Sequence, residues 1–160
     1  MRANLFLVAA LLAAPFAMPG AGDASLDRAT LRGLKTLNIE IDKLDPDLAK
    51  EGINASALQS RLMDKLQAAG IPVNQTATEF VGLRVTSVHG GRGPYALSLT
   101  IGLYQPVILS RDKDTRTATQ TWEVETILIA DSKQLFRATM ESVDELGDRF
   151  VTAFRSVNPK

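Results

Sequence analysis

Two long stretches of apolar–polar alternation restrict the fold of this chain more than any other feature. In residues 95–109 most large apolar side chains stand at odd positions, and in residues 117–130 Trp122, Val124 and Leu128 stand at even positions. Alternation with a period of two is typical of a β-strand that buries one face and exposes the other. Because a short charged segment separates the two stretches, we expect them to form an antiparallel hairpin. The apolar positions are Leu97, Leu99, Ile101, Leu103, Val107, Leu109, Trp122, Val124 and Leu128.

The same alternation predicts how the two strands of the hairpin are aligned. Opposed residues of an antiparallel pair point to one face of the sheet, so odd positions of the first strand must lie opposite even positions of the second. A turn centred on Lys113-Asp114 places Leu103 opposite Val124, and Tyr104 opposite Glu123 on the polar face. This register also pairs Asp112 with Thr115, Leu99 with Leu128 and Gln105 with Trp122.

Shorter patterns define the remaining elements. Alternation also marks residues 37–41 and 81–85 as strands, whereas residues 71–75 are either a short strand or part of a loop. Apolar residues three or four apart predict a helix that begins near Asn54 or Ser56 and ends before Gly70. The same spacing predicts a long closing helix with one apolar stripe, at about 132–157. That stripe contains Leu135, Phe136, Met140, Val143, Leu146, Phe150 and Phe154.

These elements predict an α+β fold, a two-layer sandwich within a single domain. The sheet is expected to be mostly antiparallel, with four to five strands and both helices packed on one face, in the order strand, helix, four strands, helix. Trp122 is expected in the core, and Pro106, which has no backbone N–H, at a sheet edge or a bulge. The uncovered face is expected to be polar, because Glu40, Arg84 and Glu125 lie on it.

The first residues have the pattern of an export signal. Arg2 precedes an apolar run from Ala3 to Ala17, and small residues follow it. We therefore expect a signal peptide at 1–24 and a mature domain at 25–160, with cleavage near Gly22 or Ala24. The run is short for a membrane span, so no stable span is expected after cleavage, although a retained anchor is the alternative. The chain has no cysteine, which excludes a lipid-anchored lipoprotein, so the protein is expected to be periplasmic or secreted.

Composition excludes several classes of function. The 18 basic and 18 acidic residues balance, and no basic cluster suited to nucleic acid appears. Without cysteine, and with His89 as the one histidine, the sequence predicts no metal site and no cofactor. The segment that begins at His89-Gly90-Gly91 is expected to connect two strands, because the chain has no Gly-x-Ser-x-Gly nucleophile motif. The acidic segments at 42–47 and 112–114 are expected to be solvated turns.

One pair of carboxylates remains as a candidate for chemistry. Glu123 and Glu125 lie two residues apart on the polar face, about 7 Å from each other, near the separation that glycosidases use. A polar strand face exposed to water carries such residues for solubility alone, and no pocket is predicted around them. We therefore predict no catalytic, cofactor-binding or metal-binding residue.

Several segments of the chain resemble an uncharacterised family of exported bacterial proteins. They are LRGLKTLNIEIDKLD (31–45), SALQSRLMDKLQAAGIPV (56–73), YALSLTIGLYQPVILSRD (95–112), TATQTWEV (117–124) and FVTAFRSVNPK (150–160). The resemblance implies a shared fold and assigns no activity. The element order is also similar to that of small envelope assembly domains, such as the amino-terminal domain of the Tol-system translocation protein and the lipopolysaccharide-assembly lipoprotein.

Export, a neutral surface and the lack of a reactive group of residues favour a non-enzymatic binding or assembly module of the cell envelope. Its partner is expected to be an envelope protein, bound through the open sheet face or an exposed strand edge. A small hydrolase that uses Glu123 or Glu125 is one alternative. The other alternative is a carrier of a small ligand between the helices and the sheet.

Overall fold

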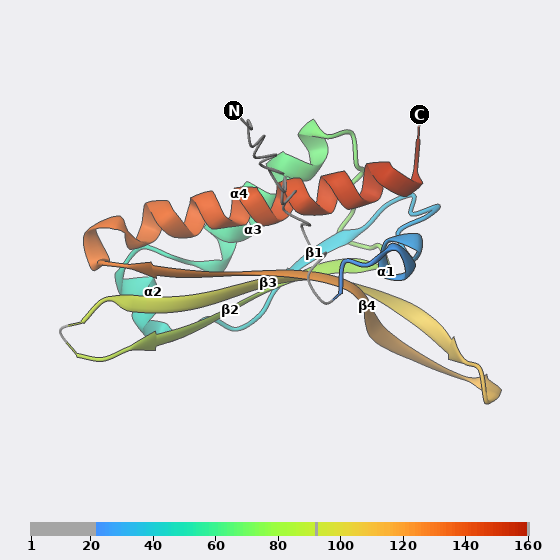
Figure 1. Ribbon diagram of the computed structural model, residues 1–160, viewed down its shortest axis with the longest axis horizontal. Helices are drawn as coiled ribbons and strands as arrows, with labels where there is room; N and C mark the ends of the chain where they lie inside the picture. The colour runs from blue at the N-terminus through green and yellow to red at the C-terminus, as the bar shows by residue number, and fades with distance from the viewer. Residues whose placement is uncertain (1–21, 92, 160) are drawn as a thin grey trace, which may run out of the picture.

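The computed structural model describes residues 22–91 and 93–159, in which helices cover one face of a four-stranded sheet (Figure 1). The predicted α+β class is confirmed. The signal peptide expected at 1–24 lies outside the described residues except for Gly22, Asp23 and Ala24. The elements are α1 (Ser25–Ala29), β1 (Asn38–Ile41), α2 (Pro46–Lys50), α3 (Ala55–Ala68), β2 (Phe80–His89), β3 (Tyr95–Leu109), β4 (Asp112–Ala130) and α4 (Ser132–Val157).

The strands follow the order β1-β2-β3-β4 across the sheet, so β1 and β4 are its edges. β1 runs parallel to β2, which requires the crossover through α2 and α3, and the other neighbours are antiparallel. The optional strand at 71–75 is reduced to one isolated bridge between Leu37 and Val73. The sheet therefore has four strands in the described part of the chain.

Helix α3 begins and ends where its sequence predicts. The Asn54 side chain accepts a hydrogen bond from the Ala57 N–H, which satisfies a donor of the first turn. At the other end Gly70 adopts φ +79°, and the N–H groups of Gly70 and Ile71 donate to the carbonyls of Gln67 and Leu66. This pair of bonds is the Schellman motif, which glycine favours because it has no side chain to strain.

The segment at 42–47 is more ordered than a solvated turn. Asp45 accepts a hydrogen bond from the Asp47 N–H, and Pro46 follows it at the first helical position, so the segment begins helix α2. Asp42 forms an ion pair with Arg84 at 2.9 Å. The predicted solvated turn is found at residues 42–45, but Pro46 and Asp47 belong to α2, because an Asp-Pro pair can cap a helix as well as break a strand.

The core lies between the sheet and helices α3 and α4, as the alternation predicts. The side chain of Trp122 is 1% exposed and meets the ring of Phe150 edge-on, with ring centroids 5.2 Å apart. Gly147 lets α3 approach α4, because a Cβ there would lie 3.0 Å from Lys65 Cγ. Phe136 departs from the predicted stripe, since 46% of it is exposed.

The predicted register of the hairpin is wrong. Leu103 pairs with Trp122, not with Val124, and Tyr104 pairs with Gln120, not with Glu123. Leu99 pairs with Thr126 and Gln105 with Thr119. The turn falls at Ser110-Arg111, between Leu109 and its partner Asp112, and β4 carries extra residues at two irregularities, between Leu103 and Tyr104 and between Ile108 and Leu109 on β3. Parity determined the face of the side chains as far as Leu103, but it did not determine the position of the turn, and past Tyr104 odd positions of β3 lie opposite odd positions of β4.

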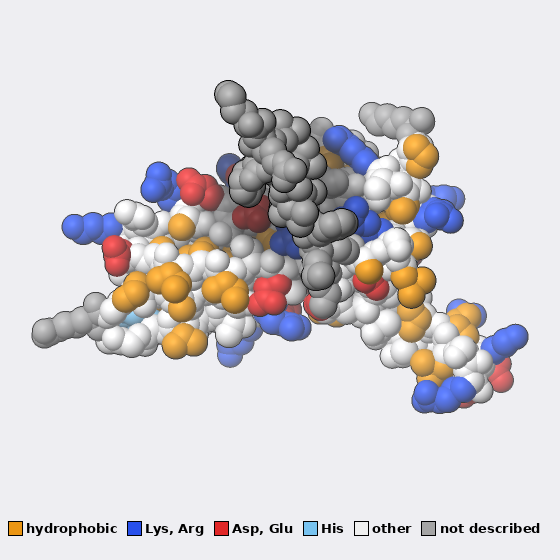
Figure 2. Space-filling model, in the orientation of Figure 1, with side chains coloured by type: hydrophobic (Ala, Val, Ile, Leu, Met, Phe, Trp, Pro, Cys, Tyr) orange, Lys and Arg blue, Asp and Glu red, His pale blue; other side chains and the backbone are white. Residues whose placement is uncertain are grey.

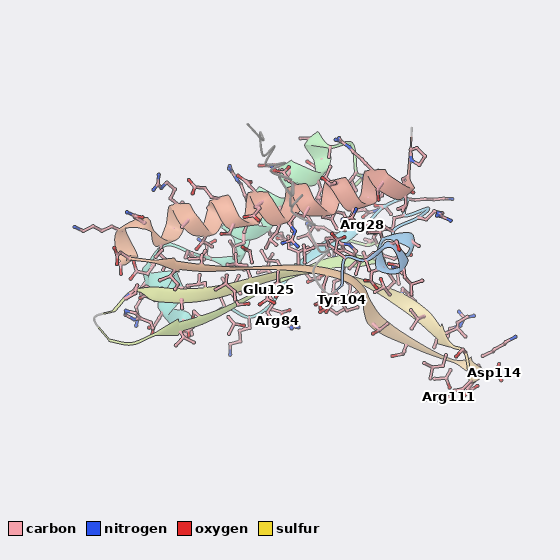
Figure 3. The ribbon with its side chains drawn as sticks, in the orientation of Figure 1. Arg28, Arg84, Tyr104, Arg111, Asp114 and Glu125 are labelled. Atoms are coloured by element: carbon pink, nitrogen blue, oxygen red, sulfur yellow. The ribbon has the colours of Figure 1, made fainter. Side chains whose placement is uncertain are left out.

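Past Tyr104 the hairpin continues as a two-stranded arm that projects from the body (Figure 1). The pairing of β3 with β2 ends at Tyr104. Pro106 therefore lies in a part of β3 that pairs with β4 on one side and with no strand on the other. The prediction of an edge position for Pro106 is thus confirmed. Arg111 and Asp114 lie at the tip of the arm (Figure 3).

Candidate binding surface on the open sheet face

One end of the open sheet face is apolar, contrary to the expectation of a polar face. Val88, Ala96 and Ile129 lie side by side on β2, β3 and β4, and Ile127 lies in the next row. We call these four residues the apolar patch. The exposed fractions of Val88, Ile127 and Ile129 are 69%, 72% and 73%. Figure 2 shows hydrophobic side chains gathered along this end of β4. Isolated apolar residues are common on surfaces, but adjacent ones indicate an interaction site.

The apolar patch borders the outer edge of β4. The Glu123 N–H donates to the Gly22 carbonyl, and the Glu125 carbonyl accepts from Arg149 Nη1 at 2.8 Å, so the backbone groups of both residues point away from β3. The N–H and C=O groups of successive residues in a strand point alternately to its two sides, so residues two apart point to the same side. The backbone groups of Ile127 and Ile129 therefore point outward as well. Among the described residues neither isoleucine has a further backbone partner beyond the ladder. This end of β4 is an open strand edge.

Charged side chains occupy the middle of the open face (Figure 3). Arg84 and Glu125 lie in one row, on β2 and β4, and Thr100 lies between them on β3. The hydrogen bond with Asp42 raises the pKa of the Arg84 guanidinium. Glu125 is exposed and accepts a hydrogen bond from the Ser98 hydroxyl at 2.5 Å.

Beyond the charged row two glycines make room for larger side chains. The Tyr104 ring lies over Gly82, where a Cβ would come within 2.9 Å of the ring, and stacks on Phe80 with centroids 4.9 Å apart. The Tyr104 hydroxyl donates to Gln120, which covers Gly102. These contacts hold Tyr104 flat against the sheet, so it is not free to stack on a ligand at this position.

The two candidate carboxylates have different surroundings. Glu123 is half-buried beside Gly22 and accepts a hydrogen bond from the Gln120 side chain, whereas Glu125 is exposed. Their side chains share the open face, as predicted. No enclosed pocket joins them among the described residues, and the hydroxyl that contacts Glu125 is that of Ser98, which lies beside it on the same open face.

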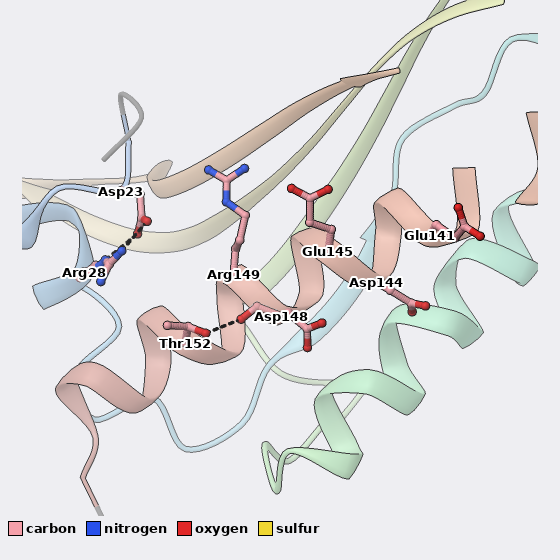
Figure 4. Close-up of a pocket in the computed structure, with 8 residues that line it drawn as sticks. All are labelled: Asp23, Arg28, Glu141, Asp144, Glu145, Asp148, Arg149 and Thr152. Carbon is pink, nitrogen blue, oxygen red and sulfur yellow. Dashed lines mark hydrogen bonds and ion pairs between the residues drawn. The ribbon is translucent and has the colours of Figure 1, made fainter. Parts of the chain in front are cut away.

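Asp23 has a structural role that the sequence reading missed. It is 7% exposed, and its Oδ1 accepts hydrogen bonds from Trp122 Nε1 at 2.7 Å and Arg28 Nε at 2.8 Å. Arg28 Nη2 donates to Oδ2 at 2.6 Å (Figure 4). Burial alone raises the pKa of Asp23, but the hydrogen bonds from Arg28 and Trp122 outweigh it and hold that pKa below 3.8. The signal available in the sequence was a core tryptophan, whose indole N–H needs an acceptor.

His89 is the last residue of β2, and its ring is held by contacts with neighbouring residues of the chain. Its ring stacks on Tyr95 with centroids 3.9 Å apart, and its Nε2 lies 2.9 Å from the Gly93 carbonyl. Burial, and then the hydrogen bond to Glu51, raise the pKa of the Tyr95 hydroxyl. The segment from Gly90 to Pro94 connects β2 to β3, as expected.

Several grooves lie on the helical side of the molecule. A groove of about 500 Å³ between α1 and α4 is lined mainly by carboxylates of α4, with Arg149 among them (Figure 4). Two of these carboxylates pair with α3, Asp144 with Arg61 and Asp148 with Lys65. The space between helices and sheet is filled by the buried side chains of the core. The ligand-carrier alternative thus has no observation that favours it.

Two further features concern metals and membranes. Within residues 22–91 and 93–159, no three histidines or carboxylates converge in a way that could hold a metal ion. The helices of this same region include none with the length and apolar character needed to cross a bilayer.

Several solved structures resemble the fold of this chain, and three of these weak likenesses are described here. No protein-family model matches the chain, and no curated protein does. A variant of PelC, a dodecamer from Paraburkholderia phytofirmans, is 14% identical, with a TM-score of 0.41 over 72% of this chain and 84% of that one. A minor lipoprotein from Acinetobacter baumannii is 15% identical, with a TM-score of 0.39 over 78% and 92%. The rare lipoprotein B from Shewanella oneidensis is 11% identical, with a TM-score of 0.38 over 77% and 96%. TM-scores of this size do not imply a shared function.

Proposed function

We propose that this chain is a non-enzymatic, exported module of the bacterial cell envelope that binds an extended segment of a partner protein along the outer edge of β4. The sequence of the first residues supports export, because it combines a positive start, an apolar run and small residues. The open edge and the apolar patch support binding. No group of residues in the described chain supports turnover.

A single observation carries this proposal. Ile127 and Ile129 each expose an apolar side chain on the open face and turn their backbone N–H and C=O groups outward. Soluble proteins protect such edges with charges, prolines or covering elements, because an exposed apolar edge pairs with other strands. At positions 127 and 129 the edge carries isoleucines and no such protective charge. A binding function explains why it stays open.

The chemistry of the edge defines the segment that fits it. Outward backbone groups pair with an extended strand and not with a helix. Side chains of an added strand alternate between faces, so every second residue of the segment must be apolar to lie beside Ile127 and Ile129. Glu125 follows on the same face with only the Ser98 hydroxyl bound to it, and therefore favours a lysine or arginine on the partner.

Photo-crosslinking in living cells tests this location. A photoreactive amino acid at position 129 is expected to link the exported chain to a partner protein, whereas the same group at position 108 is not. Ile108 is the matched control, because it is 55% exposed on a strand but lies on the arm. The double variant Ile127→Lys and Ile129→Lys should remove the crosslink by placing two charges on the edge, and leave the circular-dichroism spectrum unchanged.

Three outcomes contradict the proposal. A crosslink that joins two copies of this chain makes the edge a dimer interface. Equal crosslinking from positions 108 and 129 indicates collision without a site. The absence of any adduct from position 129 in folded, exported protein shows that no segment binds there.

A further inference from the structure

Asp23 belongs to the folded domain, although the sequence pattern places it at the exit of the leader. Its carboxylate is the acceptor for the indole N–H of the buried Trp122 and for two nitrogens of Arg28. Removal of Asp23 leaves a buried indole donor without its partner and removes the ion pair of Arg28, which is one-third exposed. A mature chain without Asp23 therefore loses the hydrogen-bond acceptor of the buried indole.

Export signals end in a small residue, a spacer and another small residue before the cleaved bond. Two positions fit this pattern near the domain. One is Gly20-Ala21-Gly22, with the cut before Asp23, and the other is Gly22-Asp23-Ala24, with the cut before Ser25. Only the first cut retains the carboxylate that Trp122 requires.

We propose that export processing cuts the chain between Gly22 and Asp23, and that the α-ammonium group created on Asp23 forms an ion pair with the Glu123 carboxylate. The reaction is hydrolysis by a signal peptidase: water cleaves the amide bond, Gly22 leaves with a carboxylate, and Asp23 keeps the amine, which takes up a proton. The inference rests on export, which is part of the proposed function, but not on any partner.

Contacts around Gly22 support the ion pair. A Cβ at Gly22 would lie 2.4 Å from Glu123 Cγ, so the chain at this point is packed directly against the Glu123 side chain. Gly22 lines a small pocket of about 230 Å³, and both charged residues that line it, Asp27 and Glu123, are carboxylates. Two carboxylates without a cation in the lining favour a positive group, and the new ammonium supplies it.

The other charged groups near the new terminus already form hydrogen bonds or ion pairs with other residues. Asp27 accepts a hydrogen bond from the Ala24 N–H, and Arg28 is bound to Asp23. On α4, Arg149 donates to the Glu125 carbonyl and contributes positive charge near Asp23. Glu123, bound only by the neutral Gln120 side chain, remains as the counter-ion.

The cut also changes the edge of β4. Gly22 leaves with its carbonyl, which accepts a hydrogen bond from the Glu123 N–H. Glu123 then turns a free N–H outward, on the same edge as Ile127 and Ile129. Processing thus lengthens the open edge.

The first test is the amino-terminal sequence and intact mass of the full chain after production with its own leader in a Gram-negative host. The expected first residue of the exported protein is Asp23. A chain that begins at Ser25, or at any other residue, overturns the proposed cut while leaving export intact. Uncut chain confined to the cytoplasm contradicts export itself, and with it both proposals.

The second test compares chains released from a fusion partner so that they begin at Asp23 or at Ser25. The chain that begins at Ser25 is expected to have a Tm lower by about 5 °C or more, because Trp122 Nε1 loses its acceptor. Equal Tm values overturn the argument that Asp23 is required.

The third test measures the pKa of the α-amine of the processed protein by NMR. The Glu123 carboxylate is expected to raise it above its usual range of about 7.7–8.0. Glu123→Gln should lower it toward that range, and Glu40→Gln, an exposed carboxylate on β1, should not. An unshifted pKa in the unaltered protein overturns the ion pair, even where the cut is correct.

Discussion

Single residues decide how the amino-terminal segment joins the domain. Asp23 binds Trp122 and Arg28, yet the sequence reading assigned it to a leader and left Trp122 without an acceptor. Composition and periodicity carry no information on such a contact, because the two residues are ninety-nine positions apart in the chain. The burial of Trp122 itself was predictable, since its parity places it on the apolar face.

A change at Asp23 should alter stability in a manner that depends on pH. Asp23→Asn is expected to lower the free energy of unfolding by about 1–2 kcal/mol at pH 7, because a charged acceptor becomes a neutral one. The pKa of Asp23 is below 3.8 when folded, so its stabilisation is complete above about pH 4 and disappears as the pH falls through the folded value. Urea unfolding at pH 7 and pH 3 measures this.

The control for that experiment is Asp64→Asn, which changes an exposed carboxylate on α3. It should leave the free energy of unfolding unchanged. A loss in Asp23→Asn that is equally large at both pH values would assign the effect to packing and not to charge.

At the scale of elements, the sequence predicted which residues form strands and helices better than how they join. The hairpin of β3 and β4 shows the reason. Alternation determines which face a side chain occupies as far as Leu103. The extra residue of β4 beside Tyr104 and the turn at Ser110-Arg111 then shift the pairing, and the apolar pattern does not reveal either of them. Helix α2 was missed because five residues are too few to show a period.

The end of α3 provides a prediction at this scale. Gly70→Ala is expected to lower the free energy of unfolding by about 1 kcal/mol, because alanine is strained at φ +79°. Gly90→Ala is the matched control, since its φ is not positive and a Cβ there meets nothing within 4 Å. Thermal unfolding of both variants measures the difference. Equal losses in the two variants would contradict the role assigned to the Schellman motif.

For the whole molecule, the division into a covered and an open face was predictable, but the character of the open face was not. Ile127 and Ile129 stand at odd positions of β4, which face the open side and are polar from Thr121 to Glu125. The expectation of a polar open face did not take these two isoleucines into account. The fold explains their position, since β4 is an edge and nothing among the described residues covers this end of it. The sequence predicted a surface for binding, and the structure locates an apolar patch beside a free edge.

Residue-resolved amide hydrogen exchange tests this account most directly. In the isolated chain, the N–H groups of Ile127 and Ile129 should exchange quickly, while those of Thr126 and Leu128, which point toward β3, should be protected. In the complex with the crosslinked partner, the two isoleucine amides should become protected as well. Protection of these amides in the isolated chain, or unchanged exchange in the complex, would contradict binding along the edge of β4.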